Sequence, residues 1–404
     1  MTTERIDTLH AVTSPLSLVL LRGQLRHLQA AGFHPAALCA PGPFVEQAGL
    51  EKSIALFTVA MEREVSPLKD LVSLVRILRL LRRLRPTICN AGTPKAGLLV
   101  MLAAWLARVP CRVYTMHGLR LDTAHGLRRI LLSTTERVAC ACADRVICVS
   151  PSLRDRAVAL RLVNTKKIVV QGSGSVGIDP GQFVPTPARV ERAAEIRREL
   201  KLGAGPVIGY IGRITRDKGV AELVTAFDLL RLQIADASLL LIGDFEQGDA
   251  IEPDVRVRIE AGMGIVVIPF QSEIAPYYLA MDVFALPTYR EGFPSTVLEA
   301  QAAERPVVTT LATGAVDSVL DGRSGMLVPV GDSRALADAL GKLLSNPAVA
   351  RRMGQAGRER VERDFRQELV WGDLVEQYRA LLRERGLPLP VAAAPKEKLC
   401  LQKQ

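Results

Sequence analysis

The fold class is decided by the stretch Pro206-Val-Ile-Gly-Tyr-Ile211, which is followed by Gly212-Arg-Ile-Thr-Arg-Asp-Lys-Gly219 and then by Val220–Leu230. The first segment is an apolar run with the length of a buried strand, and the last has the spacing of a helix with one apolar face. A strand that passes through a short polar loop into a helix is the repeating unit of proteins with helices on both faces of a parallel sheet. The stretch therefore predicts an α/β fold.

The same alternation of apolar runs and helical patterns continues along the chain in two series. Strands of the first series are expected at Ile6–Val12, Ala36–Ala40, Ala55–Val59, Thr87–Asn90, Arg112–Met116, Arg145–Val149 and Ile168–Val170. Strands of the second series are expected at Pro206–Ile211, Ser238–Ile242, Ile265–Ile268, Asp282–Leu286, Val307–Thr310 and Gly325–Val328. Glycine, serine and proline interrupt the pattern between Gly172 and Gly205. Two series predict two doubly wound, Rossmann-like domains.

Helical patterns fill the segments between these strands and the end of the chain. Helices are expected at Leu16–Ala30, Ser66–Arg85, Val190–Leu200, Val220–Leu230, Ala335–Leu344, Ala348–Phe365 and Gln367–Arg385. We therefore expect a first domain at 1–175, a linker with a short helix at 176–204, a second domain at 205–365, a final helix at 366–386 and a disordered tail at 387–404.

Composition limits the classes of protein to consider. The chain has 404 residues, of which 49% are hydrophobic and 23% are charged, so it can form two globular domains. The net charge of +10 is compatible with nucleic acid, an anionic membrane or phosphate-bearing ligands as partners. Aromatic residues make up only 4% of the chain, which argues against a surface that stacks nucleic-acid bases. No nucleic-acid partner is therefore expected.

Cysteine usage indicates a reducing compartment, and the lengths of the apolar runs indicate whether the chain can cross a membrane. The cysteines are odd in number and none forms a doublet with zinc-site spacing, so we expect neither disulfides nor a structural metal. They are Cys39, Cys89, Cys111, Cys140, Cys142, Cys148 and Cys400. The start at Met1–Arg5 has no apolar signal region, and no apolar run is long enough to cross a bilayer. We expect a soluble protein, or one held on a membrane from outside.

Two basic residues lie on the loop after the strand Pro206–Ile211. Ligands of open α/β sheets bind at the carboxyl ends of the strands, which places Arg213 and Lys218 on the functional edge. A guanidinium and an ammonium at this spacing can hold two phosphates, one as a fork and one as a point charge. The alternative is a basic turn exposed to solvent.

The segment Glu291-Gly-Phe-Pro-Ser-Thr-Val-Leu-Glu299 follows the strand Asp282–Leu286 on the same edge. Gly292 permits close approach of the backbone to a ligand, and Pro294 suits the start of a helix. The helix start would offer an anion the unpaired amides of Ser295, Thr296 and Val297. The alternative is an ordinary capped helix with acidic residues near its start.

One histidine is placed as a ligand-binding group would be. His117-Gly118 ends the strand Arg112–Met116, where an imidazole can hydrogen-bond a ligand at the sheet edge. The alternative is a structural histidine. Ser14-Pro15 follows the first strand, and because the chain has no Gly-x-Gly-x-x-Gly there, we expect no dinucleotide site in the first domain.

The helix Ser66–Arg85 has an apolar side and a basic side. Its apolar face is expected to consist of Leu68, Leu71, Val72, Val75 and Leu78. Its basic face is expected to consist of Arg76, Arg79 and Arg83, with further charge from Arg82 and Arg85. Such a helix can lie on anionic lipid, and Lys95 and the pair Arg128-Arg129 would add to the surface charge. The alternative, which we favour for the packing, is a helix that packs on the sheet with a solvated basic face.

Taken in this order, the motifs resemble the retaining glycosyltransferases of family four (glycosyl transferases group 1), from Ile6 to about Arg385. The resemblance rests on Gly212-Arg213…Lys218-Gly219, Glu291-Gly-Phe-Pro-Ser…Leu-Glu299-Ala, His117-Gly118, Gly-Ser-Val-Gly-Ile-Asp179…Phe183 and Gly322-Arg-Ser-Gly325…Val328-Pro…Gly-Asp332. It implies the GT-B fold, with two Rossmann-like domains facing across a cleft and a C-terminal helix that crosses back to the first domain. The chain is most similar to bacterial members that act in capsular or exopolysaccharide biosynthesis.

The resemblance implies roles for individual residues. Arg213 and Lys218 would bind the donor diphosphate, Glu291 would contact sugar hydroxyls, Glu299 would hold the ribose, and His117 would lie near the donor sugar. The predicted donor-binding residues are Gly212, Arg213, Lys218, Gly243, Glu291, Gly292, Phe293, Pro294, Ser295, Thr296 and Glu299. The predicted catalytic residues are His117, Glu291, Arg213 and Lys218. The predicted acceptor-side residues are Ser14, Pro15, Lys95 and Arg120, with Ser14-Pro15 standing where the family often has a Gly-Gly turn.

The predicted reaction is transfer of a sugar from a nucleotide sugar to a lipid-linked saccharide, with retained anomeric configuration. UDP-linked hexoses or N-acetylhexosamines are the expected donors, with GDP-mannose second. No cofactor or metal is expected, because the basic pair and the helix start would stabilise the leaving diphosphate. The expected location is cytoplasmic, on the inner face of the bacterial plasma membrane. Two alternatives remain open: a GT-B nucleotide-sugar epimerase or hydrolase, and a non-enzymatic basic scaffold on a membrane surface or nucleic acid.

Overall fold

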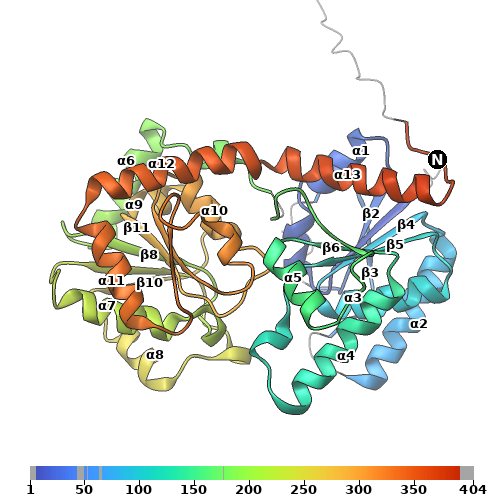
Figure 1. Ribbon diagram of the computed structural model, residues 1–404, viewed down its shortest axis with the longest axis horizontal. Coiled ribbons are helices and arrows are strands. Elements are labelled where there is room, and N and C mark those ends of the chain that lie inside the picture. The colour runs from blue at the N-terminus through green and yellow to red at the C-terminus, as the bar shows by residue number, and fades with distance from the viewer. Residues whose placement is uncertain (1–5, 43–49, 52, 63–65, 176, 392–404) are drawn as a thin grey trace, which may run out of the picture. The chain divides into compact units, whose positions relative to one another are not determined.

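The computed structural model describes residues 6–42, 50–51, 53–62, 66–175 and 177–391. Val176 of the linker, Cys400 and the predicted tail from residue 392 onward lie outside the described residues, as does Met1–Arg5. Packing divides the chain of Figure 1 into two compact units. The first unit consists of Met1–Thr115, Thr134–Ile147 and Trp371–Gln404, and the second of Met116–Ser133 and Cys148–Val370. The domain boundaries given above stay a prediction.

The first sheet has seven strands in the order β3-β2-β1-β4-β5-β6-β7. The strands are β1 (Thr8–Ala11), β2 (Pro35–Cys39), β3 (Ala55–Thr58), β4 (Ile88–Gly92), β5 (Cys111–Met116), β6 (Arg145–Cys148) and β7 (Ile168–Val170). The pairs β1–β2, β1–β4, β2–β3 and β4–β5 are parallel. Each expected strand of the first series is confirmed, because a strand buried on both faces is apolar along its whole length.

The second sheet has six strands in the order β10-β9-β8-β11-β12-β13, and its neighbouring strands are parallel. The strands are β8 (Val207–Ile211), β9 (Ser238–Ile242), β10 (Ile265–Ile268), β11 (Val283–Leu286), β12 (Val307–Thr310) and β13 (Met326–Val328). The strand order reverses between β8 and β11, and ligands of open α/β sheets bind at such a switch point. The loops that follow these two strands carry the predicted basic pair and Glu291.

Helices connect the strands in both units. The first part of the chain contains η1 (Pro15–Leu21), α1 (Gln24–Ala30), α2 (Pro67–Leu84), α3 (Pro94–Leu106), η3 (Arg120–Thr123), α4 (Gly126–Cys142), α5 (Pro151–Ala159) and η4 (Pro180–Phe183). The second part contains α6 (Pro187–Glu199), η5 (Arg216–Lys218), α7 (Val220–Arg231), η6 (Gln247–Asp249), α8 (Pro253–Glu260), α9 (Ala275–Ala280), α10 (Ser295–Ala302), η7 (Val316–Ser318), α11 (Ser333–Leu344), α12 (Pro347–Asp364) and α13 (Gln367–Glu384). Two parallel sheets covered by helices confirm the predicted α/β fold.

The predicted continuous helix Leu16–Ala30 is wrong. The segment instead forms the 3₁₀ helix η1, a turn, and the shorter helix α1. The turn occurs at Gly23, which has φ 74°, and a Cβ atom there would lie 2.6 Å from the indole of Trp371. The glycine at this turn thus lies against a residue of α13, a contact that no local pattern reveals.

The predicted packing of the helix Ser66–Arg85 is also wrong. Helix α2 buries Ser73, Ile77, Leu80 and Leu81, whereas Leu68, Leu71, Val72 and Val75 of the predicted core face are exposed. The Ser73 hydroxyl can be buried because the carbonyls of Ala60 and Lys69 lie 2.5 and 2.8 Å from it. The basic residues of the helix lie on the exposed side, as predicted.

A buried network of hydrogen bonds holds α13 in the first unit. The side-chain amide of Asn90 on β4 donates to the Tyr378 hydroxyl of α13 at 2.7 Å, and Thr115 donates to Asn90 at 2.8 Å. Tyr378 also packs its ring edge-on to Phe33 with a centroid distance of 5.9 Å. Residues from Trp371 onward belong to the first unit, so the C-terminal helix returns to it as the GT-B prediction requires.

A buried carboxyl group lies on the other side of the same unit. The Tyr114 hydroxyl of β5 donates to Glu136 Oε2 of α4 at 2.8 Å. Burial raises the pKa of Glu136 to about 7 from its usual 4.5, although the hydrogen bond from Tyr114 acts in the opposite direction. The native protein therefore holds a proton on Glu136 in a pH range where the unfolded chain does not.

The cysteines of the described chain are free thiols. Cys39, Cys89, Cys111, Cys140 and Cys148 are buried, and Cys142 is half-buried. Burial raises the pKa of the Cys89 thiol to about 12. Buried thiols of this kind pack as small apolar groups.

We predict that Tyr378→Phe lowers the free energy of unfolding by about 1–3 kcal/mol, because Asn90 would lose a buried acceptor. Tyr277→Phe is the matched control, since Tyr277 and its hydrogen-bond partner Gln271, 3.1 Å from the hydroxyl, are both only half-buried. Denaturant titration followed by circular dichroism measures both variants. Equal losses of unfolding free energy in the two variants would mean that the hydrogen bonds through Asn90 do not anchor α13.

The pKa of Glu136 predicts a pH-dependent stability. Because the native pKa lies above the unfolded value, stability is fully present below about pH 4.5 and is lost as the pH rises through about 7. Glu136→Gln removes the titration, so its stability relative to the parent should increase by up to about 3 kcal/mol between pH 5 and pH 8. Thermal unfolding at several pH values tests this, and a constant difference between the two proteins would contradict it.

Candidate active site

The basic loop after β8 and the acidic segment after β11 meet in an ion pair. Lys218 Nζ lies 2.5 Å from Glu291 Oε1, and both side chains are largely buried. The Glu291 amide donates to the Thr313 carbonyl at 2.9 Å, which holds the acidic segment against the loop after β12. The structure therefore brings together two of the residues predicted to be catalytic.

Arg213 lies on the same edge and is paired with a carboxylate that the sequence analysis missed. Its guanidinium forms a short ion pair with Glu246, and Asp217 lies 4.0 Å away. Burial alone would lower the pKa of Arg213, but Glu246 and Asp217 raise it above its ordinary value. Glu246 follows β9 as Lys218 follows β8, so the rule that placed Lys218 on the edge would also have found Glu246.

Asp217 joins three loops at this edge. Its carboxylate accepts from Thr215 at 2.7 Å and from Arg290 at 2.6 Å, and its carbonyl accepts from the Tyr289 amide at 2.9 Å. Its own amide donates to Asp249 at 2.9 Å. Burial alone would raise the pKa of Asp217, but Arg290 and Thr215 hold it below its usual range. The acid thus fixes the loop that presents Lys218.

Two glycines of the predicted set allow contacts between backbones. A Cβ atom on Gly292 would lie 2.2 Å from the His117 carbonyl oxygen, and one on Gly243 would lie 2.0 Å from the Gly212 carbonyl oxygen. Gly243 also has φ 143°, which L side chains rarely adopt. These contacts place His117-Gly118 beside Glu291-Gly292 within the second unit, and the loop after β9 beside the loop after β8.

His117 is neutral at physiological pH. Burial lowers the pKa of its imidazole to about 4, well below the usual value of 6.5. A neutral imidazole can both donate and accept a hydrogen bond. His117 can therefore contact a hydroxyl group without placing a positive charge in the site.

The second glutamate of the motif is held by a tyrosine that has no motif signal. The Tyr278 hydroxyl of α9 lies 2.8 Å from Glu299 Oε2 and 3.1 Å from the Thr296 carbonyl. Burial raises the pKa of Glu299, while hydrogen bonds from Tyr278 and Ser295 lower it. Tyr278 thus orients Glu299 on α10.

The start of α10 only partly matches its prediction. Phe293 packs against Phe365 with ring centroids 5.2 Å apart, and Pro294 precedes the first helical residue, Ser295. The Val297 amide donates to the Pro294 carbonyl at 3.2 Å, so the prediction that this amide is unpaired is wrong. The amides left for an anion at this helix start are those of Ser295 and Thr296.

The predicted acceptor-side residues divide between the two units. Ser14, Pro15 and Lys95 belong to the first unit, where the Thr13 and Thr93 hydroxyls lie 2.7 Å apart and join their loops. Arg120 belongs to the second unit, at the start of η3. The acceptor role of these four residues stays a prediction.

The expectation that Lys95 adds to the surface charge is wrong. Its side chain is only 9% exposed, and its ammonium lies 2.6 Å from Asp70 Oδ2 of α2. The ion pair joins the second residue of α3 to the first turn of α2. Sequence reasoning counted the lysine as a free charge because the partner acid lies on another helix.

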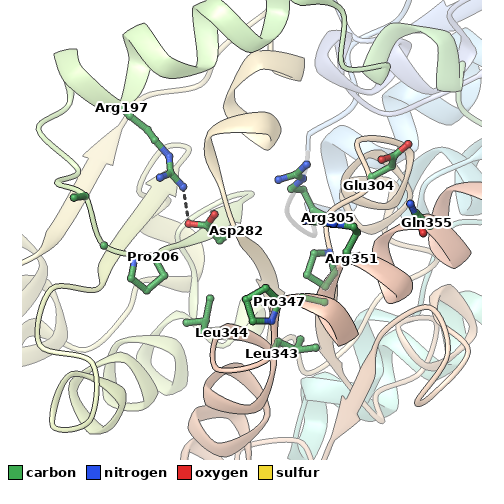
Figure 2. Close-up of a pocket in the computed structure, with 14 residues that line it drawn as sticks. Arg197, Pro206, Asp282, Glu304, Arg305, Leu343, Leu344, Pro347, Arg351 and Gln355 are labelled. Atoms are coloured by element: carbon green, nitrogen blue, oxygen red, sulfur yellow. Dashed lines mark hydrogen bonds and ion pairs between the residues drawn. The ribbon is translucent and has the colours of Figure 1, made fainter.

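Figure 2 shows a cavity of about 570 Å³ at the opposite edge of the second sheet. Its lining includes Pro206 and Asp282, which directly precede β8 and β11, and Arg305, which lies two residues before β12. Arg197 of α6 pairs there with Asp282 at 2.5 Å. None of the predicted site residues is among the lining residues of this cavity. We therefore place the site at the carboxyl edge, where the ion pair lies.

The described residues contain no group of three or more His, Cys, Asp or Glu side chains that could hold a metal ion. The positive charge at the carboxyl edge comes from side chains, chiefly Lys218 and Arg213. The arrangement can receive an anion between these cations and orient hydroxyl groups with Glu291 and Glu299.

Two Rossmann-like units built on parallel sheets are the architecture of the GT-B fold. Anabaena HepE, solved in complex with UDP-glucose, superposes with a TM-score of 0.76 over 93% of this chain and 99% of that chain, at 19% sequence identity, and so shares the fold.

Sequence comparison gives the family. A model described as "Glycosyl transferases group 1" matches residues 205–346, and a "Glycosyl transferase 4-like domain" model matches residues 4–174. The "Capsular polysaccharide biosynthesis glycosyltransferase CapM" of Staphylococcus aureus is 35% identical over 93% of this chain and 97% of its own length. A GDP-mannose-dependent phosphatidylinositol monomannoside mannosyltransferase of Mycolicibacterium smegmatis is 34% identical over 45% of this chain and 49% of its own length. The chain belongs to this glycosyltransferase family.

The close approach at Gly292 can be tested by adding one methyl group. Gly292→Ala should lower the free energy of unfolding by about 1–3 kcal/mol, because the new Cβ atom would overlap the His117 carbonyl. Gly248→Ala is the control, since a Cβ atom there meets no atom within 4 Å. Denaturant titration measures both, and an equally stable Gly292→Ala protein would contradict the contact.

Proposed function

We propose that this glycosyltransferase moves a sugar from a nucleotide-sugar donor, most readily a UDP-sugar, to a lipid-linked saccharide acceptor in surface polysaccharide biosynthesis, with retained configuration. The observation that carries the proposal is the pairing of Lys218 with Glu291 beside Arg213 at the switch point of the second sheet. The name of the S. aureus relative supports the polysaccharide role, and the UDP-glucose complex of HepE supports the donor class.

The leaving diphosphate is the group that most needs stabilisation. Lys218 is paired with Glu291, and Arg213 is paired with Glu246 and lies 4.0 Å from Asp217; each cation retains donors for a phosphate oxygen. Charge that develops on the departing diphosphate would fall between these two cations and the start of α10. The two side chains supply the positive charge, so we propose that the reaction requires no metal cofactor.

Glu291 would orient the sugar and would not attack it. Its carboxylate is held by Lys218, and a carboxylate in an ion pair is a poorer nucleophile than a free one. We infer that the acceptor attacks from the same face as the departing diphosphate, which takes up the acceptor proton. Glu299, oriented by Tyr278, would hold the ribose, and the neutral His117 would bond a sugar hydroxyl.

The acceptor and the location belong to the same proposal. A lipid-linked saccharide is held at a bilayer, so the enzyme would work as a peripheral protein on the cytoplasmic face of the plasma membrane. The net charge of +10 favours an anionic surface of this kind.

The proposal predicts the effect of removing the Lys218 charge. Lys218→Met should lower kcat about 100-fold or more, because one donor to the leaving group is lost. Arg216→Met is the matched control, because Arg216 lies on the same loop but is exposed and pairs with Glu252. Release of nucleoside diphosphate is measured for a panel of UDP- and GDP-sugars, with and without a lipid-linked saccharide extract and with a metal chelator.

Each arm of this experiment has a distinct meaning. Release that needs the extract and survives the chelator supports a metal-independent transferase. Equal release without the extract would point to a hydrolase. Unchanged activity of both Lys218→Ala and Glu291→Ala would contradict the proposed site.

A further inference from the structure

The cavity of Figure 2, at the edge of the second sheet opposite the candidate active site, has no part in the proposed reaction. We call it the amino-edge cavity. Its volume of about 570 Å³ falls within the range of about 300–1,000 Å³ that is usual for small-molecule sites. All the residues that line it belong to the second unit, so the cavity is formed within one folded unit.

Five charged side chains line the amino-edge cavity, and both of its carboxylates already have a cationic partner. Asp282 pairs with Arg197 of α6 at 2.5 Å. Glu304 pairs with Arg358 of α12 at 3.2 Å. The negative charge of the cavity wall is therefore balanced before its two remaining arginines are counted.

The two remaining arginines have no carboxylate partner of their own. Neither Arg305 nor Arg351 lies within ion-pair distance of an acid in the part of the chain that the structure describes. Arg305 donates from Nε to the Ala303 carbonyl at 3.0 Å and from Nη1 to the Met281 carbonyl at 3.1 Å. A guanidinium has five N–H donors, so these two bonds orient Arg305 and leave three donors for another acceptor.

The half-buried guanidinium of Arg305 is stabilised by an anion. Burial lowers its pKa, and this effect outweighs Asp282 and Glu304, which raise the pKa. Because a guanidinium keeps its proton in a folded protein, the desolvation of this charge costs folding free energy. An anion in the cavity offsets that cost, and Arg351 supplies a second positive charge from the second turn of α12.

We propose that the amino-edge cavity binds the phosphate monoester of a sugar. A phosphate dianion can accept from Arg305 and Arg351 together, since a planar guanidinium matches the spacing of phosphate oxygens. Figure 2 shows these two arginines on one side of the cavity and the pair of Arg197 and Asp282 on the other. The phosphate group therefore lies on the first of these sides.

The rest of the lining indicates the organic part of the ligand. Pro206, Leu344 and Pro347 offer apolar contacts to the C–H groups of a sugar ring, and Glu304 and Gln355 offer hydrogen bonds to its hydroxyl groups. No aromatic side chain is among the described residues that line the cavity, so a nucleobase finds no ring on which to stack. A sugar phosphate thus fits the lining better than a nucleotide does.

A ligand in the amino-edge cavity connects elements that lie far apart in the sequence. Arg197 belongs to α6, Arg305 lies two residues before β12, and Arg351 belongs to α12. A sugar phosphate that contacts these elements binds the folded second unit and not the unfolded chain, so it should raise the melting temperature of that unit.

Calorimetric titration of the full-length protein with glucose 6-phosphate tests the proposal. Excess UDP is present, so that the proposed donor site is already occupied. The parent protein should bind glucose 6-phosphate more tightly than inorganic phosphate or glucose, because only the whole molecule uses both the arginines and the hydroxyl-binding groups. High salt should weaken the binding, since the arginines hold the phosphate by charge.

Two substitutions on α12, each with a matched control, locate the binding. Arg351→Gln should weaken the binding of glucose 6-phosphate about 10-fold, because one charged donor to the phosphate is lost. Arg352→Gln is its control, since Arg352 is also exposed but does not line the cavity. Ala350→Leu narrows the cavity and should weaken the binding as well, whereas Ala348→Leu, at an exposed position outside the lining, should not.

The outcomes distinguish this site from the proposed donor site. Lys218→Met should weaken the binding of UDP and leave that of glucose 6-phosphate unchanged, and Arg351→Gln should do the reverse. Binding of glucose 6-phosphate by a parent protein that does not bind UDP would reject the donor site and leave the amino-edge cavity standing.

Three results would overturn the proposal. The first is a parent protein that does not bind glucose 6-phosphate. The second is equal affinity of Arg351→Gln and Arg352→Gln for this ligand. The third is tighter binding of AMP than of glucose 6-phosphate, lost in Arg351→Gln, which would mean that the cavity takes a nucleotide and not a sugar phosphate.

Discussion

The ion pair between Lys218 and Glu291 depends on the order of strands in the second sheet. Because β8 and β11 are neighbours and run parallel, the loops that follow them leave the sheet at the same edge. Gly219 permits the two loops to approach closely, since a Cβ atom there would overlap the Pro287 carbonyl oxygen. Asp217 then fixes the basic loop by bonding to Arg290, Thr215 and the Tyr289 amide. Topology sets the position, and this hydrogen-bonded carboxylate sets the orientation.

The charges at this edge compensate one another in pairs. Lys218, which is largely buried, lies against Glu291, and the more exposed Arg213 lies against Glu246, so neither cation is isolated. A diphosphate that enters such an edge finds two cations that are already positioned and loses little energy to rearrangement. Because Glu291 is paired with Lys218, we propose that the acidic motif serves mainly to position the sugar and the ribose, although it is the most visible feature of the sequence. We propose that the positive charge that favours departure of the diphosphate belongs to the basic loop.

Much of the fold follows from local sequence. All the strands were predicted within a few residues, because most of them are buried and apolar. The rule that the carboxyl ends of parallel strands meet at one edge correctly placed the basic loop and the acidic segment together, but it did not predict the ion pair between Lys218 and Glu291. Predictions failed where a distant side chain decides the outcome. The helix is broken at Gly23, which lies against the indole of Trp371, and Lys95 is paired with Asp70 of another helix.

The error in the face of α2 has a similar origin. Periodicity identified an apolar row and a basic row but could not say which side packs on the protein, and hydrogen bonds to Ser73 allow a partly polar side to be buried. Tyr278 was missed because a single tyrosine on α9 has no motif around it. Both cases show that a pattern predicts which residues lie together more reliably than which partner they meet.

The central claim, that the Lys218–Glu291 edge binds the nucleoside diphosphate, is tested most directly by calorimetric titration of UDP. The double variant Lys218→Met/Glu291→Gln removes both charges and avoids an unpaired buried carboxylate, so it should fold like the parent. We predict that it binds UDP at least about 10-fold more weakly, since a hydrogen bond to a charged group contributes about 1.5–3 kcal/mol. Equal affinity of the folded double variant and the parent would contradict the claim.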